Sequence, residues 1–211
     1  MGFSVNFNLL LVTDPIAPRQ KMLDIISEAG EAGVLAVQFR AKGLSLREQF
    51  EMASAIWKVT QRWGMKLLIN DRVDLCLALD ADGVHLPSTG LPILVARRLL
   101  GGAKGIGVSC HSLEEALRAE SDGADYAVLG PIYDTPEKRA YGTPLGIDYF
   151  RHVRQAVSIP LFAIGGIKIK TISEVMSSGA DGVAMISEIT KAKAVGEQCR
   201  AILRRIGEVP C

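Results

Sequence analysis

Three polar side chains with alternating spacing follow an apolar run early in the sequence. Gln38, Arg40 and Lys42 stand two positions apart, so in an extended segment they point to the same side. Two cations beside an amide suit a carboxylate or a phosphate, because both anions accept charge-assisted hydrogen bonds. The spacing therefore predicts a site for an anionic ligand; the alternative is a solvated strand end without a ligand.

A carboxylate follows the third apolar run, in the stretch Asn70-Asp71-Arg72. Asp71 is placed to hold a metal ion or a cationic ring at the end of a strand. It is equally placed to cap the helix expected from residue 73, since aspartate is a preferred helix N-cap. The stretch alone leaves both readings open.

A histidine and a hydroxyl follow the fifth apolar run. Ser109 and His111 lie at its end, and histidine is the side chain best suited to proton transfer near neutral pH. His85 lies within an apolar run and His152 on an expected helix, so both are weaker candidates. We therefore take His111 as the candidate catalytic proton carrier.

The last three apolar runs are followed by residues suited to a phosphate. The segment 130–142 is rich in Pro, Gly and polar residues, and we expect it to be a lid over an anionic group that carries Thr135, Lys138 and Arg139. Gly165 and Gly166 follow the seventh run and expose backbone N–H groups, and Ser187 follows the eighth with a hydroxyl and an N–H. Loops after strands seven and eight form the usual phosphate cradle of a (β/α)8 barrel.

The elements that must position these groups alternate along the whole chain. Short, continuously apolar runs suit parallel strands buried on both faces, and we expect strands over residues 9–13, 34–39, 66–69, 83–86, 105–109, 126–130, 160–164 and 182–186. Helical spacing between them predicts helices over residues 19–32, from 45 onward, and over 73–79, 91–100, 112–121, 147–156, 171–178 and 194–206. Ser45 with Glu48, and Ser112 with Glu115, have capping-box spacing.

Eight strand–helix units without a low-complexity linker are typical of a single (β/α)8 TIM barrel, an α/β fold with a parallel eight-stranded sheet. An open doubly wound sheet is the alternative, but its usual glycine-rich turn does not follow the first strand. A recurring phrase of small residues and an apolar run precedes strands two, four, six and eight. We expect its glycine to end a helix in the left-handed conformation and its polar tail to reach the C-terminal mouth of the barrel.

Composition narrows the class of protein. The chain has 211 residues, 48% of them hydrophobic and 22% charged, with a net charge of +1, so one large domain over residues 1–211 is possible and a nucleic-acid partner is not indicated. The apolar start of the chain is interrupted by Thr13, Asp14 and Pro15, which predicts neither a signal peptide nor a membrane span. The four cysteines lack metal-ligand spacing, and we expect reduced thiols in a cytoplasmic protein.

Seven motifs in order resemble the thiamin phosphate synthase/TenI family and cover nearly the whole chain. They are VQFRAK, LLINDRVD, ADGVHL, GVSCHSLEEA, GADYAVLGPIYDTPEK, IPLFAIGGI and GADGVAMISEI. Each piece alone is common, whereas the combination is specific. The resemblance implies a compact (β/α)8 barrel, usually a homodimer, that acts on a phosphorylated thiazole in thiamin biosynthesis.

The resemblance implies two activities that share one site. The synthase joins a hydroxymethylpyrimidine diphosphate to a thiazole phosphate and releases pyrophosphate with Mg²⁺. Its pyrophosphate and metal site matches Gln38, Arg40, Lys42, Asn70, Asp71, Ser109 and Lys138. Its thiazole phosphate site matches Thr135, Gly166, Ile186 and Ser187. The TenI-type tautomerase instead aromatises a carboxythiazole phosphate without a metal, through a histidine that matches His111.

Two departures from the synthase pattern favour the tautomerase. Gly90 stands where the synthase usually has a second Mg²⁺-binding aspartate, and Glu137 stands where it usually has a threonine. The stretch HLPS followed by LP also looks like the TenI branch. We therefore expect a TenI-like thiazole tautomerase in which Arg40 and Lys42 bind the substrate carboxylate. The alternatives are a Mg²⁺-dependent thiamin phosphate synthase with Asp71 as the metal ligand, and a non-catalytic regulator that binds thiazole phosphate.

Overall fold

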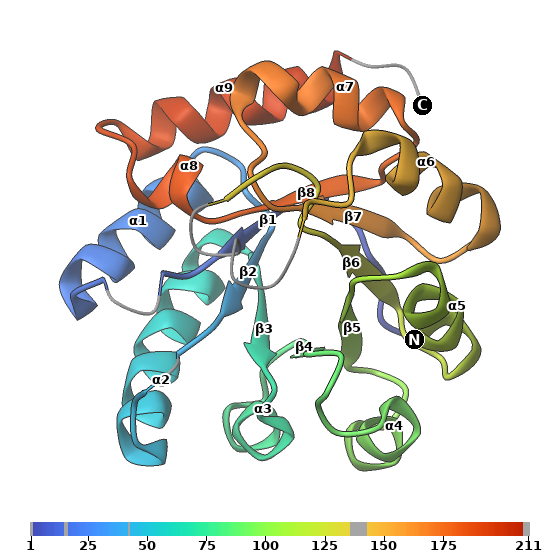
Figure 1. Ribbon diagram of the computed structural model, residues 1–211. Coiled ribbons are helices and arrows are strands. Elements are labelled where there is room, and N and C mark those ends of the chain that lie inside the picture. The colour runs from blue at the N-terminus through green and yellow to red at the C-terminus, as the bar shows by residue number, and fades with distance from the viewer. Residues whose placement is uncertain (1, 15–16, 42, 136–142, 209–211) are drawn as a thin grey trace.

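Eight parallel strands close into a barrel in the computed structural model, which describes residues 2–14, 17–41, 43–135 and 143–208 (Figure 1). Each strand pairs with the next along the chain, and the last pairs with the first. The strands are β1 Leu9–Val12, β2 Ala36–Phe39, β3 Lys66–Asn70, β4 Gly83–Leu86, β5 Gly105–Cys110, β6 Tyr126–Leu129, β7 Leu161–Ile164 and β8 Gly182–Met185. The predicted (β/α)8 barrel is therefore confirmed, and the open-sheet alternative is wrong because β8 hydrogen-bonds β1.

Helices surround the strands on the outside of the barrel (Figure 1). They are α1 Arg19–Glu31, α2 Leu46–Trp63, α3 Val73–Leu79, α4 Ile93–Leu100, α5 Leu113–Ser121, α6 Ile147–Ala156, α7 Ile172–Ser177, α8 Ser187–Thr190 and α9 Val195–Gly207. The expected helix over 171–178 is preceded by a 3₁₀ turn, Ile169–Thr171. None of the described helices is both long enough and apolar enough to cross a bilayer.

Alternate residues of the strands face the barrel interior, because successive side chains of a strand point to opposite faces. Phe7 lies below β1, and its ring is 5.7 Å from that of Tyr126 and 5.4 Å from that of Phe162. The other strand residues in this inner cluster are Leu10, Val12, Ala36, Leu68, Val128 and Ala184. The remaining buried apolar residues of the strands pack outward against the helices. Besides these two apolar layers, the strands carry the buried polar residues Gln38 and His85.

The recurring phrase of the sequence joins neighbouring strands at their amino ends. In three of its copies an aspartate accepts a hydrogen bond from the backbone N–H near the start of the preceding strand. These bonds run from Leu67 to Asp82 (2.8 Å), from Ile106 to Asp125 (2.7 Å) and from Leu161 to Asp181 (2.8 Å). The residue in the left-handed conformation is glycine in three copies and Asp80, with φ of 51°, in the fourth. The repeat is thus a structural device at the end of the barrel opposite the predicted site.

The three described cysteines are buried free thiols, Cys76, Cys110 and Cys199. Burial raises the pKa of Cys76 and of Cys110 to about 12 and that of Cys199 to about 11, so these thiols stay protonated. No disulfide joins these three cysteines, Cys211 lies outside the described residues, and the reduced state expected from the sequence stays a prediction.

Replacing one of the repeated aspartates tests this structural role. Asp125 accepts hydrogen bonds from both the Ile106 N–H and the Arg97 guanidinium, each 2.7 Å long. Asp125→Ala leaves both partly buried donors without that acceptor, and we expect a loss of about 1–3 kcal/mol in the free energy of unfolding. Urea denaturation measures the loss, with Asp122→Ala, at the half-buried residue that follows α5, as the control. Equal stability of the two variants would contradict the role.

Candidate active site

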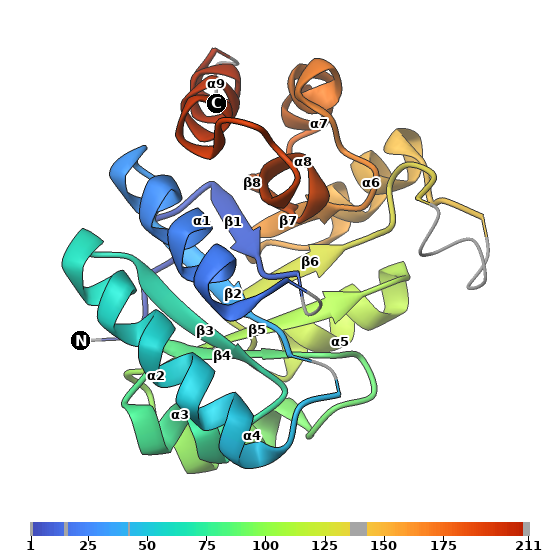
Figure 2. The ribbon, with the colours of Figure 1, turned by 90° about the vertical axis from the view of Figure 1, so that its left-hand side faces the viewer.

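The predicted site residues come together at one end of the barrel. Figure 2 shows the strands from the side, with their carboxyl ends on the side away from the N-terminus. We call this end the mouth; it receives the ends of β2, β3 and β5 and the turns that follow β7 and β8. The predicted residues found there are Gln38, Arg40, Asn70, Asp71, Ser109, His111, Thr135, Gly165, Gly166, Ile186 and Ser187. Lys42, Glu137, Lys138 and Arg139 lie outside the described residues, so their predicted roles stay predictions.

Hydrogen bonds between neighbouring strands hold the first group of polar residues. The buried Gln38 donates its amide N–H to the Asn70 Oδ1, at 2.9 Å. Arg40 follows the last residue of β2, and its N–H donates to the Thr13 Oγ1 at 2.9 Å while the Thr13 hydroxyl donates to the Arg40 carbonyl at 3.1 Å. Thr13 therefore fixes the backbone that carries the Arg40 cation. The sequence analysis missed this role, although a hydroxyl residue at a strand end was a usable signal.

Asp71 is an exposed carboxylate at the end of β3. Its N–H donates to the His85 carbonyl at 2.9 Å, and its φ of 64° is unusual for a residue other than glycine. The N-cap of α3 is Arg72, and no side chain caps that helix. The helix-cap interpretation of Asp71 is therefore wrong. The bond to β4 turns the residue away from the helix and leaves its carboxylate at the mouth.

The position of Gly90 relative to Asp71 bears on metal binding. A Cβ built on Gly90 would lie 3.0 Å from the Asp71 Oδ1. A carboxylate at position 90 would thus share a site with Asp71, and glycine leaves Asp71 alone. The described residues contain no cluster of three or more metal-ligating side chains. One carboxylate still fits Mg²⁺, which is commonly bound by one or two carboxylates together with substrate phosphates and water.

Glu115 holds His111 at the mouth. The Glu115 carboxylate accepts the His111 backbone N–H at 2.7 Å and lies 3.1 Å from the His111 Nδ1. The His111 side chain is 48% exposed. The Ser112 Oγ accepts the Glu115 N–H at 3.1 Å, which is half of the predicted capping box. The other half is wrong, because Glu115 binds His111 in place of the Ser112 N–H.

His85, a weaker candidate than His111 on sequence grounds, is an interior residue of the barrel. It is 2% exposed, and burial lowers its pKa to about 3, so it is neutral. Its Nδ1 lies 3.1 Å from the Tyr126 hydroxyl and its Nε2 lies 2.9 Å from the Ser109 Oγ. Burial also raises the pKa of Tyr126, so the phenol keeps its proton. Ser109 is therefore hydrogen-bonded to His85 and is linked through it to Tyr126 beneath the mouth.

The turns after β7 and β8 expose backbone N–H groups. Gly165 and Gly166 have φ of 98° and 66°, and a Cβ on Gly166 would lie 2.7 Å from that of Tyr133. Packing against Tyr133 thus requires glycine at position 166, whether or not a ligand binds there. The N–H groups of Gly166 and Ser187 donate to no described acceptor. The Thr135 Oγ1 is buried and has no hydrogen-bond partner among the described residues.

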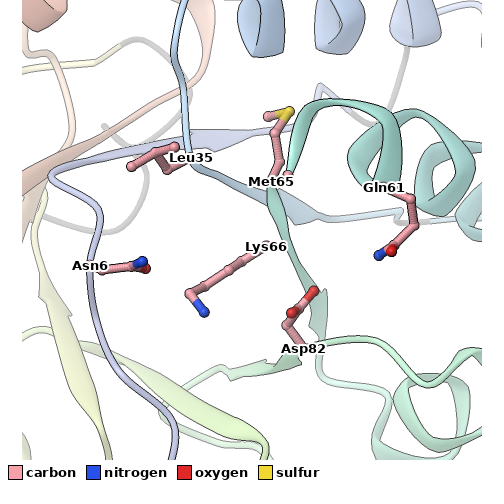
Figure 3. A pocket seen from close by; sticks show the side chains of 7 residues that line it. Asn6, Leu35, Gln61, Met65, Lys66 and Asp82 are labelled. Atoms are coloured by element: carbon pink, nitrogen blue, oxygen red, sulfur yellow. The ribbon is translucent and has the colours of Figure 1, made fainter.

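A hollow at the opposite end of the barrel is a separate feature. It has a volume of about 240 Å³ and is lined by Asn6, Leu35, Gln61, Gly64, Met65, Lys66 and Asp82 (Figure 3). It lies where the first copy of the repeat has Leu35 in place of an aspartate. Asp82 is engaged by the Leu67 N–H, and the Lys66 Nζ lies 4.9 Å from the centre of the Phe3 ring. Asp82 and Lys66 are therefore already engaged by other residues of the barrel, and the described members of the predicted site lie at the mouth instead.

The chain resembles known proteins over nearly its whole length. Residues 9–189 match the thiamine monophosphate synthase family. A Geobacter sulfurreducens protein named as a candidate thiamine-phosphate synthase is 46% identical over 200 residues, and this covers 94% of both chains. The thiamine-phosphate synthase of Chloroflexus aurantiacus is 43% identical over 203 residues, also 94% of both chains.

A solved structure agrees with the sequence relatives. The thiamine phosphate pyrophosphorylase from Pyrococcus furiosus superposes with a TM-score of 0.87 at 34% identity, covering 97% of this chain and 98% of that one. A 3-hexulose-6-phosphate synthase, with a TM-score of 0.74 at 17% identity, shares the fold alone. The expectation of a tautomerase ahead of a synthase receives no specific support from these relatives, which favour the synthase alternative. The chain belongs to the thiamin phosphate synthase/TenI family.

Proposed function

We propose that the protein is a thiamin phosphate synthase, which couples hydroxymethylpyrimidine diphosphate with thiazole phosphate and releases pyrophosphate. The observation that carries the proposal is the gathering of anion-binding groups from both sides of one mouth, in a chain whose relatives are named as synthases. Arg40, Asn70 and Ser109 form one side of this mouth, and Gly166 and Ser187 form the other. A reaction between two phosphorylated substrates requires two sets of anion-binding residues that face the same mouth.

The geometry supports a reaction in which negative charge develops on a leaving pyrophosphate. As the carbon–oxygen bond to the diphosphate breaks, its electron pair moves to the pyrophosphate oxygen, and the lone pair of the thiazole ring nitrogen forms the new bond to that carbon. Fixed donors stabilise such charge without reorganising during the reaction. Arg40 supplies a cation held in place through Thr13, and Ser109 supplies a hydroxyl held by His85. Lys42 and Lys138 are proposed to add cations to the same group.

Mg²⁺ is the cofactor that this reaction implies, and Asp71 is the proposed protein ligand. When bound, the ion would neutralise charge on the diphosphate. Asp71 fits this role because its carboxylate is exposed at the mouth and is anchored through the backbone to β4. Water and phosphate oxygens would complete the coordination.

The second substrate is proposed to lie across the mouth from the diphosphate. Its phosphate would accept the N–H groups of Gly166 and Ser187, together with the Thr135 hydroxyl, which has no other described partner. Gly165 and Ile186 immediately precede Gly166 and Ser187 in the two turns. This arrangement keeps the two phosphates on different donors and leaves the space between them for the reacting atoms.

The tautomerase and the non-catalytic regulator are the competing functions. His111 is exposed and oriented by Glu115, an arrangement that proton transfer requires. The same contact is compatible with a synthase, so it does not separate the two. The homodimer and the cytoplasmic location expected from the sequence stay predictions.

Product formation tests the proposed function directly. The purified protein is incubated with both synthase substrates and Mg²⁺, and thiamin phosphate and pyrophosphate are quantified. We expect equal amounts of the two products, and loss of both on addition of EDTA. His111→Ala is assayed in parallel with carboxythiazole phosphate as the substrate. If the protein shows no synthase turnover but a tautomerase activity that depends on His111, the tautomerase function replaces this proposal. Binding of thiazole phosphate without either reaction would indicate a regulator.

Restoring the second carboxylate tests the metal site. Gly90→Asp places a charge beside the Asp71 Oδ1, whereas Gly90→Asn places a neutral group of the same size there. We expect added Mg²⁺ to raise the Tm of Gly90→Asp, because the ion relieves repulsion between two neighbouring carboxylates. The Asn variant and the unmodified protein should shift little. If added Mg²⁺ leaves the Tm of Gly90→Asp unchanged, the placement of the ion at Asp71 is contradicted.

Removing the Ser187 hydroxyl tests the thiazole phosphate side. Ser187→Ala retains the backbone N–H but loses a donor to a charged phosphate, and such hydrogen bonds contribute about 1.5–3 kcal/mol. We expect KM for thiazole phosphate to rise by about tenfold or more, with KM for the pyrimidine diphosphate little changed. Ser121→Ala, on exposed α5, is the matched control. Equal increases in both KM values would argue against two separate phosphate positions.

A further inference from the structure

A chain of hydrogen bonds links three neighbouring strands beneath the mouth. His85 on β4 lies opposite Gly107 on β5, and Gly107 lies opposite Tyr126 on β6. A Cβ on residue 107 would lie 2.0 Å from the Tyr126 Cζ, so only glycine allows the phenol ring to cross β5. The ring crosses, and its hydroxyl reaches the His85 Nδ1 at 3.1 Å. Ser109, two residues after Gly107 on the same face, meets the other ring nitrogen at 2.9 Å.

The protons in this chain have one arrangement that satisfies every buried donor. Tyr126 is fully buried, and His85 Nδ1 is the one described partner of its hydroxyl. A buried O–H needs an acceptor, so Tyr126 donates to the His85 Nδ1. A neutral imidazole carries one ring proton, which then lies on Nε2. That N–H donates to the Ser109 Oγ, which acts as the acceptor in this bond.

Ser109 is thereby left with its own proton to donate. Its oxygen is engaged by His85, and its side chain is partly exposed at the end of β5, on the side of the mouth. We propose that Tyr126 and His85 are positioning residues that hold the Ser109 hydroxyl as a hydrogen-bond donor directed into the mouth. In the opposite tautomer the Ser109 hydroxyl would donate its proton to the His85 Nε2. Only the lone pairs of its oxygen would then face the mouth, and these would repel an anionic ligand.

The proposal rests on the proposed function only for the identity of the acceptor, which is an oxygen of the diphosphate. A donor directed at an oxygen that gains charge should act on the chemical step more than on substrate affinity. This chain of hydrogen bonds therefore predicts that loss of the Tyr126 hydroxyl lowers kcat, although Tyr126 is fully buried and does not reach the substrate. A residue that merely filled the core would not act through one hydroxyl.

A double-mutant cycle tests this coupling in the synthase reaction. Ser109→Ala should lower kcat by about 10²–10³-fold, as removal of a transition-state donor does. Tyr126→Phe keeps the ring and removes only the hydroxyl, and we expect kcat to fall about threefold to tenfold with KM values unchanged. In the Ser109→Ala background the same change should have almost no effect on kcat. Independent, multiplicative effects would overturn the proposal, because they would show that Tyr126 does not act through Ser109.

Nitrogen NMR of histidine-labelled protein tests the tautomer without any activity. The chain has three histidines, and His85→Gln identifies the His85 signals by their loss. We expect a proton on Nε2 and none on Nδ1 in the unmodified protein, and a mixture of tautomers in Tyr126→Phe. A proton on Nδ1 in the unmodified protein would overturn the proposal. Absence of synthase turnover together with the Nε2–H tautomer would instead refute the proposed function, and the positioning of Ser109 by Tyr126 and His85 would still hold.

Discussion

The pairing of β8 with β1 is the interaction on which the rest of the structure depends. It closes the sheet, so that every strand carries its carboxyl end to the same mouth. Closure also removes both sheet edges, and the backbone groups that would otherwise face solvent are paired. Residues separated by more than a hundred positions, such as Arg40 and Ser187, face the same space for this reason.

The interior of the barrel changes character along its axis. The lower part is packed with apolar and aromatic side chains around Phe7 and Phe162, and the polar residues Gln38, His85 and Ser109 lie nearer the mouth. Buried polar groups are tolerated when each finds a partner, and an unpaired one costs stability. The hydrogen bonds of Gln38 with Asn70 and of His85 with Ser109 restrain these side chains beneath the mouth.

Gly90, Glu137 and the stretch HLPS followed by LP led to the expectation of a tautomerase ahead of a synthase. The structure shows that position 90 does adjoin Asp71. However, Mg²⁺ takes much of its coordination from phosphate oxygens and water, so one protein carboxylate is compatible with its use. Similarity to synthases over 94% of the chain is the broader observation, and it favours the synthase.

The sequence by itself determined the order of the strands and helices, the barrel class, the family and the residues that follow each strand. It could do so because burial on both faces makes strands continuously apolar and because a parallel barrel always places its carboxyl ends together. Only the tertiary structure decided that Asp71 leaves α3 uncapped, that Glu115 binds His111, and that Tyr126 reaches His85 across Gly107. These contacts depend on side-chain directions between strands or around a turn, and the same residue types at the same spacing permit several partners. Local patterns therefore specify the elements, whereas hydrogen-bond partners follow from how the closed barrel packs them.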